Sequence, residues 1–394
     1  MGQTTHARNY GGNSVNVITG NGQRPIPTTR LKRLTMARKT NNTILHKAKE
    51  SKCDEFYTQY CDIERELIHY TPQFKGKTVY CNCDEPSKSN FFKYFLNNFH
   101  TLGLKKLIAS CYNKNADPMF GNHGIATGSF LVYQGEPIKD IGEILPALPL
   151  HGDGDFRSEE CRNLLAECDI VVTNPPFSLF REFISLLMRY NKKFLAIGNI
   201  NAITYKEIFE LIQGNEIWLG HNMGRGISGF IVPEHYELYG TETRIDENGQ
   251  RIVSSNNCLW LTNLESPLRN ESIPLSRKYK GNEADYPVFD NYDAINVNRT
   301  HDIPADFAGV MGVPITFLHK YNPRQFQIIQ FRKGNDGKDL CINGKCPYFR
   351  ILIRNVAFSI RECELAKDSL RTCSDKRTSR SGNSTPTTIQ LSLF

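Results

Sequence analysis

Four residues near the middle of the chain place hydrogen-bond acceptors and an aromatic ring at one corner: Asn174, Pro175, Pro176 and Phe177. They follow an apolar run at 169–173 that predicts a buried strand. The two prolines fix the local backbone and remove two amide donors, so carbonyl and side-chain oxygens are left at the end of the strand. Such a corner suits an amino group attached to a flat ring.

The chemistry expected at this corner is alkylation of the exocyclic amino group of adenine, whose lone pair is delocalised into the ring. Two acceptors that bind the amino hydrogens favour a pyramidal nitrogen and stabilise the positive charge that develops during attack. Asn174 and Pro175 can supply these oxygens, and Phe177 can stack on the base. Alternatively, Asn174 could cap the next helix, and Phe177 could belong to its apolar stripe, with Phe180, Phe183, Ile184, Leu187 and Met188.

The elements that must position this corner alternate between strands and helices from residue 53 onward. Strands are predicted at 78–82, 107–112, 169–173, 194–198 and 216–219. Helices are predicted at 60–67, 89–99, 161–165, 177–188 and 205–213, the second with Ser89 as its N-cap. This alternation predicts an α/β fold with a doubly wound, mainly parallel sheet. The corner and the loops at 81–86 and 153–155 fall at carboxyl ends of strands, where such sheets bind ligands.

Beyond Gly220 the pattern changes to turns and short strands. Glycines at 224, 226 and 229, the pair Asn248-Gly249 and the run 259–262 predict hairpins, so a β-rich module is expected over 221–335. A further strand is predicted within 347–361. From about residue 364 the chain is polar and is expected to be a disordered tail.

The composition limits the class of protein and its compartment. With 394 residues, 39% of them hydrophobic and 23% charged, the chain is typical of a globular protein with room for two modules. No apolar run is long enough to cross a membrane and no export signal is present, so a cytoplasmic protein with reduced thiols is expected. Four cysteines near the C-terminus match no common zinc-ligand spacing, and no metal is expected: Cys341, Cys346, Cys363 and Cys373.

Positive charge is concentrated near the N-terminus, although the net charge of the whole chain is only +7. Residues 1–35 have the composition of a flexible arm, and 30–52 are strongly basic. The basic residues are Arg30, Lys32, Arg33, Arg38, Lys39, Lys47, Lys49 and Lys52. They form either a solvated tail and helix face or an arm that contacts phosphates.

Several segments together resemble the EcoRI-type adenine-specific DNA methyltransferases, which use S-adenosylmethionine. The resemblance runs from about residue 36 to about residue 330 and is carried by the corner and by 52–60, 80–84, 152–158, 199–205 and 311–317. It implies a Rossmann-like methyltransferase sheet with a smaller β-rich DNA-recognition module. It also implies methyl transfer to the N6 amino group of an adenine in double-stranded DNA, within GAATTC, in restriction–modification or epigenetic marking.

The resemblance also implies roles for residues around the corner. Tyr57 and Thr58 are expected at the methionine end of S-adenosylmethionine, and Cys81, Asn82 and Asp84 around its middle. The cofactor's adenine is expected beside a third group: Asp153, Asp155 and Phe156. Asp153 and Asp155 could also be simple turn-formers. The first loop lacks the usual Gly-x-Gly, and the second strand ends without an acidic residue, which leaves the cofactor's ribose without an assigned partner.

Methylation of duplex DNA would require the target base to leave the stack, since its amino group is inaccessible in a duplex. The expected contacts come from the basic arm (Arg30, Lys32, Arg33, Arg38, Lys39 and Lys47) and from Arg277 and Lys278 in the second module. The expected domains are a disordered arm at 1–35, a catalytic domain at 36–220, a target-recognition module at 221–335, a strand region packed on the core at 336–363, and a tail at 364–394. A bacterial or phage protein associated with the nucleoid would fit.

The chain ends in a peptide that resembles those with which bacterial replication proteins bind the polymerase sliding clamp: Gln390, Leu391, Leu393 and Phe394 around Ser392. A polar anchor followed by apolar side chains on a disordered tether suits such an apolar pocket. Two other functions stay open. The enzyme could methylate RNA adenines or protein glutamines, or the protein could be a catalytically dead DNA-binding adaptor recruited to the clamp.

Overall fold

The computed structural model describes residues 57–83, 85–86, 88–113, 127–137, 147–222, 227–234, 243–254, 257–332, 340–345 and 349–361. All of them lie in one compact unit that falls within Asn41–Phe394. Several predicted sites fall outside the described residues: the basic arm from Arg30 to Lys52, Asp84, Cys346, Cys363, Cys373 and the terminal peptide 390–394.

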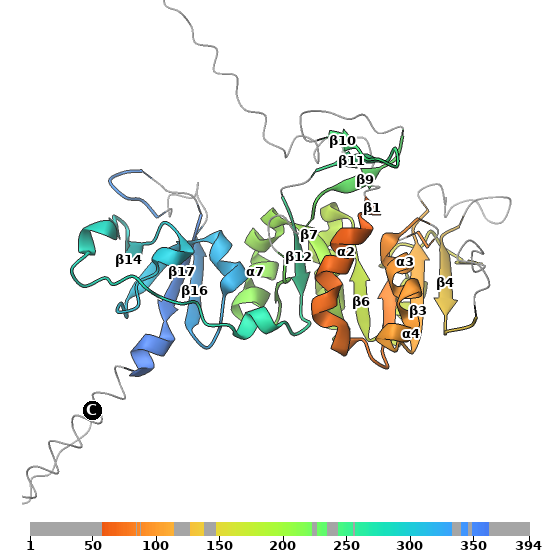
Figure 1. Ribbon diagram of the computed structural model, residues 1–394, viewed down its shortest axis with the longest axis horizontal. Helices are drawn as coiled ribbons and strands as arrows, with labels where there is room; N and C mark the ends of the chain where they lie inside the picture. Colours follow the sequence, from red (N-terminus) through yellow and green to blue (C-terminus); the bar gives the residue numbers. More distant parts are fainter. Residues whose placement is uncertain are drawn as a thin grey trace, which may run out of the picture. The chain divides into compact units, whose positions relative to one another are not determined.

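An eight-stranded sheet carries the predicted site, in the order β5-β4-β3-β2-β6-β7-β12-β8 (Figure 1). Its strands are β2 (Thr78–Cys81), β3 (Lys106–Cys111), β4 (Ser129–Tyr133), β5 (Leu148–Pro149), β6 (Ile170–Thr173), β7 (Lys193–Asn199), β8 (Trp218–Leu219) and β12 (Cys258–Thr262). Three of its seven pairings are parallel, all among β3, β2, β6 and β7. The sheet is therefore mixed, whereas the sequence predicted a mainly parallel one. The difference arises because antiparallel strands extend both edges.

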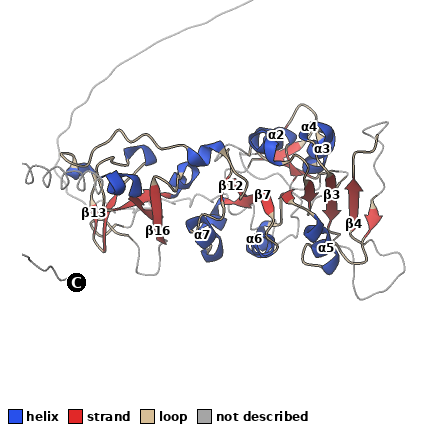
Figure 2. Cartoon of the chain, turned by 90° about the horizontal axis from the view of Figure 1, so that it is seen from below, coloured by secondary structure: helices blue, strands red, loops and turns tan. Residues whose placement is uncertain are grey.

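Helices cover both faces of this sheet, as the strand–helix alternation predicted (Figure 2). One face carries α2 (Tyr60–Leu67), α3 (Asn90–Asn97) and α4 (Phe99–Leu102), and the other carries α5 (Glu159–Glu167), α6 (Phe180–Arg189) and α7 (Lys206–Gln213). Each face has its own apolar cluster. Helix α3 begins where predicted, because the Ser89 hydroxyl accepts the amide hydrogens of Phe91 and Phe92.

Phe177 lies outside the helix that the sequence predicted over 177–188. Helix α6 begins at Phe180, and Phe177 lies before it in a 3-10 turn, η2 (Phe177–Leu179). Phe180, Phe183, Ile184 and Leu187 are buried in the cluster beneath α6, whereas Phe177 packs against the cluster on the opposite face. Each fully buried side chain of this size contributes about 2–3 kcal/mol. The stripe therefore stabilises α6 without Phe177.

Two smaller sheets complete the described structure. One has the order β1-β9-β11-β10 and joins β1 (Tyr57–Thr58) to β9 (Phe230–Val232), β10 (Thr243–Ile245) and β11 (Arg251–Val253). The other has the order β13-β14-β15-β17-β16, formed by β13 (Val288–Phe289), β14 (Tyr292–Asn296), β15 (Val310–Pro314), β16 (Phe326–Arg332) and β17 (Arg350–Asn355). The other 3-10 turns are η1 (Ile68–Gln73), η3 (Ile200–Thr204), η4 (Pro267–Asn270), η5 (Glu283–Asp285), η6 (Thr300–Asp302) and η7 (Ile315–Lys320).

The range 221–335 is divided among all three sheets. The turn at Asn248-Gly249 connects β10 to β11 as an antiparallel hairpin, as predicted. The run 259–262 is not in a hairpin: as part of β12 it pairs with β7 and β8 in the main sheet. Ile351 and Ile353 of β17 lie in the same apolar cluster as α6 and α7. None of the described helices is long and apolar enough to cross a membrane.

Candidate active site at the carboxyl edge of the parallel strands

The strand register brings the predicted corner beside the first strand-to-helix loop. Tyr80 of β2 is opposite Val171 of β6, so Asn82 and Thr173 leave the two strands at the same level. The buried Thr173 hydroxyl donates a hydrogen bond to the backbone carbonyl of Asn82. This bond joins β6, the strand that precedes Asn174, to the loop expected around the cofactor.

The corner itself lies partly covered at the end of β6. Pro175 is buried, Asn174, Pro176 and Phe177 are half-buried, and the side-chain oxygen of Asn174 is shielded from solvent. The Phe177 ring meets Phe230 of β9 edge-on, with centroids 6.3 Å apart and planes at 67°. The Phe177 ring therefore does not pack beneath α6, and its neighbour is Phe230 in the sheet formed by β1, β9, β10 and β11.

The loop after β2 makes its turn without Gly-x-Gly. Cys83 has a φ of 66°, in the left-handed region that glycine normally occupies. The neighbouring Asn82 is 2% exposed, and its Oδ1 has no hydrogen-bond partner among the described residues. A buried acceptor without a partner is costly, which suits a position that a bound ligand completes.

A second such atom comes from β1. Thr58 is 3% exposed, and no partner for its Oγ1 occurs within the described ranges. The Thr58 carbonyl accepts a hydrogen bond of 2.8 Å from the Asn90 amide, at the start of α3, which follows the β2 loop. Thr58 and Asn82 are both residues that the resemblance assigned to S-adenosylmethionine. These two polar groups fit that cofactor, while Tyr57 is half-buried beside Thr58.

The loop around Gly154 lies against the carboxyl end of β3. A Cβ on Gly154 (φ 84°) would overlap the Cys111 carbonyl oxygen, and the Asn113 amide donates to the Asp153 carbonyl at 2.8 Å. Asp153 Oδ1 accepts the Asp155 amide hydrogen at 3.0 Å, as in a turn-forming aspartate. The register thus gathers the 153–155 loop, the β2 loop and the corner along one edge, as predicted.

Asp155 is already engaged by Arg157. Its Oδ1 accepts from the Arg157 amide (2.8 Å) and Nε (2.9 Å), and its Oδ2 accepts from Nη2 at 2.6 Å. Burial would raise the pKa of Asp155, but the hydrogen bonds and charge of Arg157 outweigh it and lower that pKa. A carboxylate has about four acceptor positions, so room for one more donor is left. Phe156 is 5% exposed and packs edge-on against Phe183, as a core residue.

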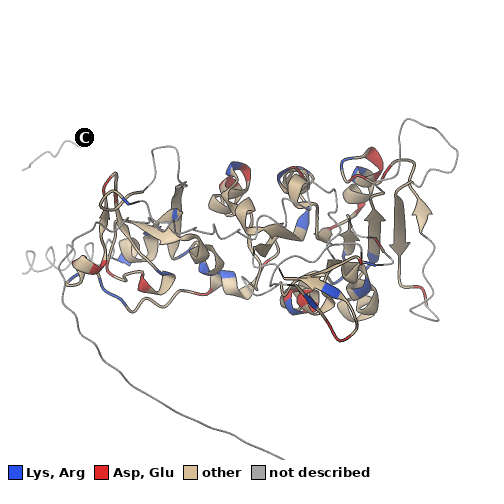
Figure 3. Cartoon of the chain, turned by 90° about the horizontal axis from the view of Figure 1, so that it is seen from above, with Lys and Arg blue, Asp and Glu red and all other residues tan. Residues whose placement is uncertain are grey.

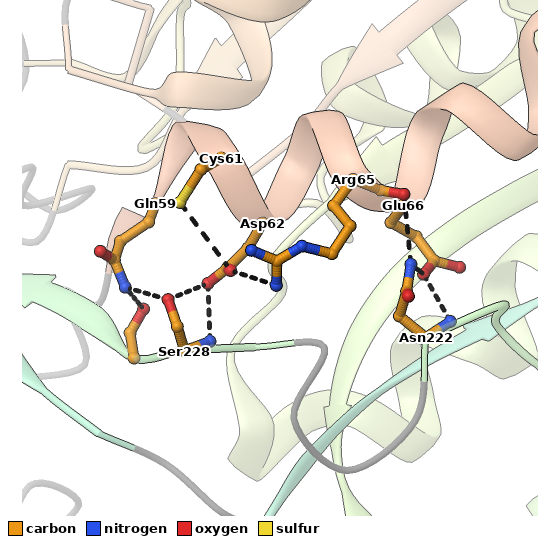
Figure 4. Close-up of polar contacts among 8 residues, drawn as sticks. Gln59, Cys61, Asp62, Arg65, Glu66, Asn222 and Ser228 are labelled. Carbon is orange, nitrogen blue, oxygen red and sulfur yellow. Dashed lines mark hydrogen bonds and ion pairs between the residues drawn. The ribbon is translucent and has the colours of Figure 1, made fainter.

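The structure also reveals polar residues near the site that were not identified from the sequence. Asp62 and Glu66 on α2 are fully buried and hold Ser228, His221 and Asn222, just before β9 (Figure 4). Their spacing offered a signal. Both acids lie beside Ile63 and Leu67 on the buried face of the helix.

The predicted DNA contacts of the second module are exposed. Arg277 and Lys278 are both open to solvent, and Arg277 Nε lies 3.7 Å from an Asp302 carboxylate oxygen. Over the described part of the chain, Lys and Arg are interspersed with Asp and Glu (Figure 3). No group of three or more metal-ligating side chains occurs within the described part.

Comparison with known proteins matches the same region. The model of the family described as "Adenine-specific methyltransferase EcoRI" matches residues 44–356. The chain belongs to the EcoRI family of adenine-specific methyltransferases. It is 63% identical over 321 residues to the Type II methyltransferase M.EcoRI of Escherichia coli, covering 81% of this chain and 98% of that protein. As a member of this family, the chain is an adenine-specific methyltransferase of the type II class.

Two relatives from mycoplasmas extend the family. The Type II methyltransferases M.MgeORF184P of Mycoplasma genitalium and M.MpnI of Mycoplasma pneumoniae are 38% and 37% identical over 327 residues. Each alignment covers 78% of this chain, and 98% and 97% of the respective relative. No solved structure matches the chain. Residues 1–43 and 357–394 lie outside the part that matches the EcoRI family model.

Proposed function

We propose that this EcoRI-family enzyme transfers a methyl group from S-adenosylmethionine to the N6 amino group of an adenine flipped out of duplex DNA, at the Asn174 corner. One observation carries the proposal. The corner leaves β6 at the same level as Asn82, and Asn82 and Thr58 both have buried oxygen atoms that find no hydrogen-bond partner among the described residues. Acceptors for an amine and polar groups for a cofactor thus lie along one edge.

The cofactor's binding residues follow from that edge. Thr58 and Asn82 would bond its polar groups, with Tyr57, Cys81 and Asp84 along the same loops. Asp155, oriented by Arg157, would accept a hydrogen bond from the amino group of the cofactor's adenine, on the β3 side of the site. Phe156 is buried against Phe183, so it is proposed to support the 153–155 loop through core packing. When bound, S-adenosylmethionine supplies a methyl group carried on a sulfonium.

The residues of the corner would orient the target amino group and stabilise the charge that develops on it. The Asn174 side-chain oxygen and the Pro175 carbonyl would accept the two amino hydrogens, turning the nitrogen lone pair out of the ring plane. They would also stabilise the positive charge that develops on that nitrogen. Pro176 fixes the backbone between them and Phe177, which would stack on the base. Phe230 supports the ring of Phe177 from the side.

The distribution of charge supports duplex DNA as the substrate. Residues 1–43 contain seven Lys or Arg and no Asp or Glu, a formal charge of +7 that equals the charge of the whole chain. The remaining residues are therefore formally neutral. A polycationic arm attached to a neutral catalytic body is suited to nonspecific phosphate contacts, with sequence readout left to other loops. Arg30, Lys32, Arg33, Arg38 and Lys39 of this segment and Lys47 just beyond it are proposed for this role, with Arg277 and Lys278 on the body.

The proposed architecture assigns these tasks to parts of the chain. The Rossmann-like catalytic domain comprises residues 36–220 together with β12, since that strand belongs to the main sheet. The rest of 221–335 would supply target recognition, and 336–363 would complete the third sheet through β17. Residues 1–35 and 364–394 would be disordered extensions. Such an enzyme would act on cytoplasmic DNA of a bacterium or phage.

A substrate competition tests this function. The purified protein is incubated with S-adenosylmethionine carrying a labelled methyl group and with duplex DNA, RNA or protein, and methylated adenines are mapped in the DNA. We expect label in N6-methyladenine at one short sequence, with a GAATTC duplex as the first probe. Label in RNA or protein glutamine, with none in DNA, would support the alternative enzymes. Cofactor binding failure with intact DNA binding would support the adaptor.

We propose as a separate property that residues 390–394 bind a bacterial sliding clamp. The supporting observation is the sequence alone, Gln390 followed by Leu391, Leu393 and Phe394, outside the region that matches the family model. A chain truncated after residue 389 should lose clamp binding and keep methylation of short duplexes. Clamp affinity that survives the truncation would contradict this proposal.

A further inference from the structure

Two buried carboxylates on α2 hold a segment that is far away in sequence. Asp62 and Glu66 are one helical turn apart, and both have no exposed surface. Asp62 Oδ2 accepts from the Ser228 amide at 2.7 Å and its hydroxyl at 2.8 Å. A buried carboxylate is expensive unless several donors bind it. These contacts are therefore specific attachments between α2 and the chain before β9 (Figure 4).

Glu66 holds the other end of the same segment. Its Oε1 accepts from the His221 amide (2.6 Å) and the Tyr70 hydroxyl (2.9 Å). Its Oε2 accepts from the Asn222 amide (2.8 Å) and side-chain nitrogen (2.9 Å). A Cβ on Gly220 would overlap Glu66 Oε1, so the close approach of helix and segment requires glycine there. The two acids thus fasten His221–Asn222 and Ser228, the two ends of one connection.

This connection begins and ends at the proposed active site. Strand β8 is antiparallel to β12, which is antiparallel to β7, so Gly220 leaves the sheet at the edge that carries Asn174. The connection then enters β9, where Phe230 pairs with Thr58 and meets Phe177. Gln59 Nε2 closes the arrangement, donating to the Ser228 hydroxyl (2.6 Å) and the Gly229 carbonyl (3.0 Å).

We propose that Asp62 and Glu66 are positioning residues of the target-base pocket: by holding both ends of the 220–228 connection, they set Phe230 against Phe177. This inference rests on the proposed role of Phe177 in base stacking. Neither acid touches the base. Their effect is on capture of the flipped adenine, and the cofactor's binding residues are left in place because β1 and α3 remain bonded through Thr58 and Asn90.

The test uses the full-length protein with Asp62→Asn and Glu66→Gln, which keep the shape of each side chain and remove one acceptor. The control is Asp169→Asn, since Asp169 is an exposed carboxylate that also accepts a backbone amide hydrogen, from Thr78 at 2.8 Å, but at the opposite edge of the sheet. Three quantities are measured: kcat/KM for a duplex carrying the mapped site, cofactor affinity, and fluorescence of 2-aminopurine at the target position.

Both variants should lose about 10- to 100-fold in kcat/KM for DNA, the scale expected when a reacting group is slightly misplaced. Their 2-aminopurine signal should fall, while cofactor affinity stays within about 2-fold, because the cofactor's contacts are untouched. A mismatch opposite the target adenine lowers the cost of flipping, and it should restore much of the lost rate. Asp169→Asn should behave as wild type in all three measurements.

A double-mutant cycle then tests the route through Phe230. Phe230→Leu alone should reproduce the defect, and adding it to Asp62→Asn should cost little more, because both act on the same contact. Wild-type kinetics in the Asp62 and Glu66 variants would overturn the inference. So would a loss shared equally by cofactor binding and activity that a mismatch leaves unrestored, since that is a merely structural defect. If the wild type itself methylates no DNA, the proposed function fails instead.

Discussion

The Thr173 hydroxyl donates a hydrogen bond to the backbone carbonyl of Asn82, and it thereby joins the strand before the proposed catalytic corner to the loop proposed for the cofactor. Thr173 lies one residue before Asn174, and both partners of the bond are almost fully buried. The two halves of the proposed site are thus held at a fixed separation by one side chain. In-line methyl transfer depends on such a separation.

Thr173→Val should reduce activity beyond its effect on stability. The isosteric change leaves a buried carbonyl without its donor, which costs about 1–3 kcal/mol of unfolding free energy. Thr262→Val is the control, because the Thr262 hydroxyl is also buried: it donates to the Phe194 carbonyl at 2.6 Å and accepts the Leu264 amide hydrogen at 3.0 Å. Urea unfolding should show a loss of stability in Thr262→Val that is at least as large as the loss in Thr173→Val, and steady-state kinetics are measured for both variants. Only Thr173→Val should lower kcat or raise the KM for cofactor, and equal kinetics would refute the link.

Cys83 should tolerate glycine better than a branched residue. Its φ of 66° costs a non-glycine residue about 1–2 kcal/mol, an amount that glycine avoids. Because glycine also gains entropy when unfolded, Cys83→Gly should change the unfolding free energy by less than about 1 kcal/mol. Cys83→Val should lose about 2 kcal/mol or more, since β-branched residues resist this region. Thermal unfolding of the two variants and the wild type measures these differences. A valine variant as stable as wild type would contradict the prediction.

Acidification should act on the stacked pair His69 and His221, whose ring centroids are 3.4 Å apart. Burial first, and then the neighbouring imidazoles, lower the pKa of each below the ordinary value of 6.5; for His221 the neighbour is His319, with Glu271 opposing. The unfolded chain therefore binds more protons than the folded one as the pH falls through this value, and stability falls with it.

His69→Phe should reduce this loss of stability between about pH 8 and about pH 5, since it removes one titrating ring and keeps the stack. The difference between the two proteins is the quantity to measure, by urea unfolding at each pH. Burial raises the pKa of Glu66 despite its hydrogen bonds, so Glu66 makes stability rise as the pH falls. This contribution is the same in the wild type and in His69→Phe, and it cancels in the difference. A difference that does not change with pH would show that the pKa of His69 is the same in the folded and unfolded chain, and would contradict the prediction.

Deletion of residues 1–43 should weaken DNA binding most at low salt. The segment carries seven positive charges and no negative ones, and it lies outside the region that matches the EcoRI family model. Each phosphate contact contributes about 0.9 to the slope of log affinity against log salt, so the slope should fall by up to about 6. Titration of a labelled duplex at several salt concentrations measures it. An unchanged slope would show that the arm makes no phosphate contacts.

Local patterns sufficed to predict much of the fold and the corner. The apolar runs of β2, β3, β6 and β7 and the Ser89 cap of α3 are short-range signals, and the structure confirms them. Strand β4 was missed although 129–133 is rich in strand-forming residues, because weakly patterned loops surround it. The placement of β12 depended on pairing with β7, a contact between segments about 60 residues apart that no local pattern specifies.

Within the candidate site, too, residues that follow local sequence patterns were predicted, and residues positioned by contacts distant in sequence were not. The Asn174 corner and Asn82 follow strands that the sequence predicted, so their shared edge was predictable. For Phe177 the sequence favoured base stacking and left the apolar stripe as an alternative because the spacing fits, and only the later start of α6 separates Phe177 from that stripe. Asp62 and Glu66 were missed although their spacing places them on the helix face of Ile63 and Leu67, because their burial depends on donors more than 150 residues away.

Transfer of a labelled methyl group by Asn174→Ala tests the central claim most directly. The assay compares wild type and variant on the same duplex, alongside cofactor and DNA binding and the unfolding midpoint of each protein. Removing the side-chain oxygen that is proposed to hold the amino group should lower kcat by about 100-fold or more. Folding and cofactor affinity should be unchanged. A folded Asn174→Ala protein that methylates adenine at the wild-type rate would contradict the account.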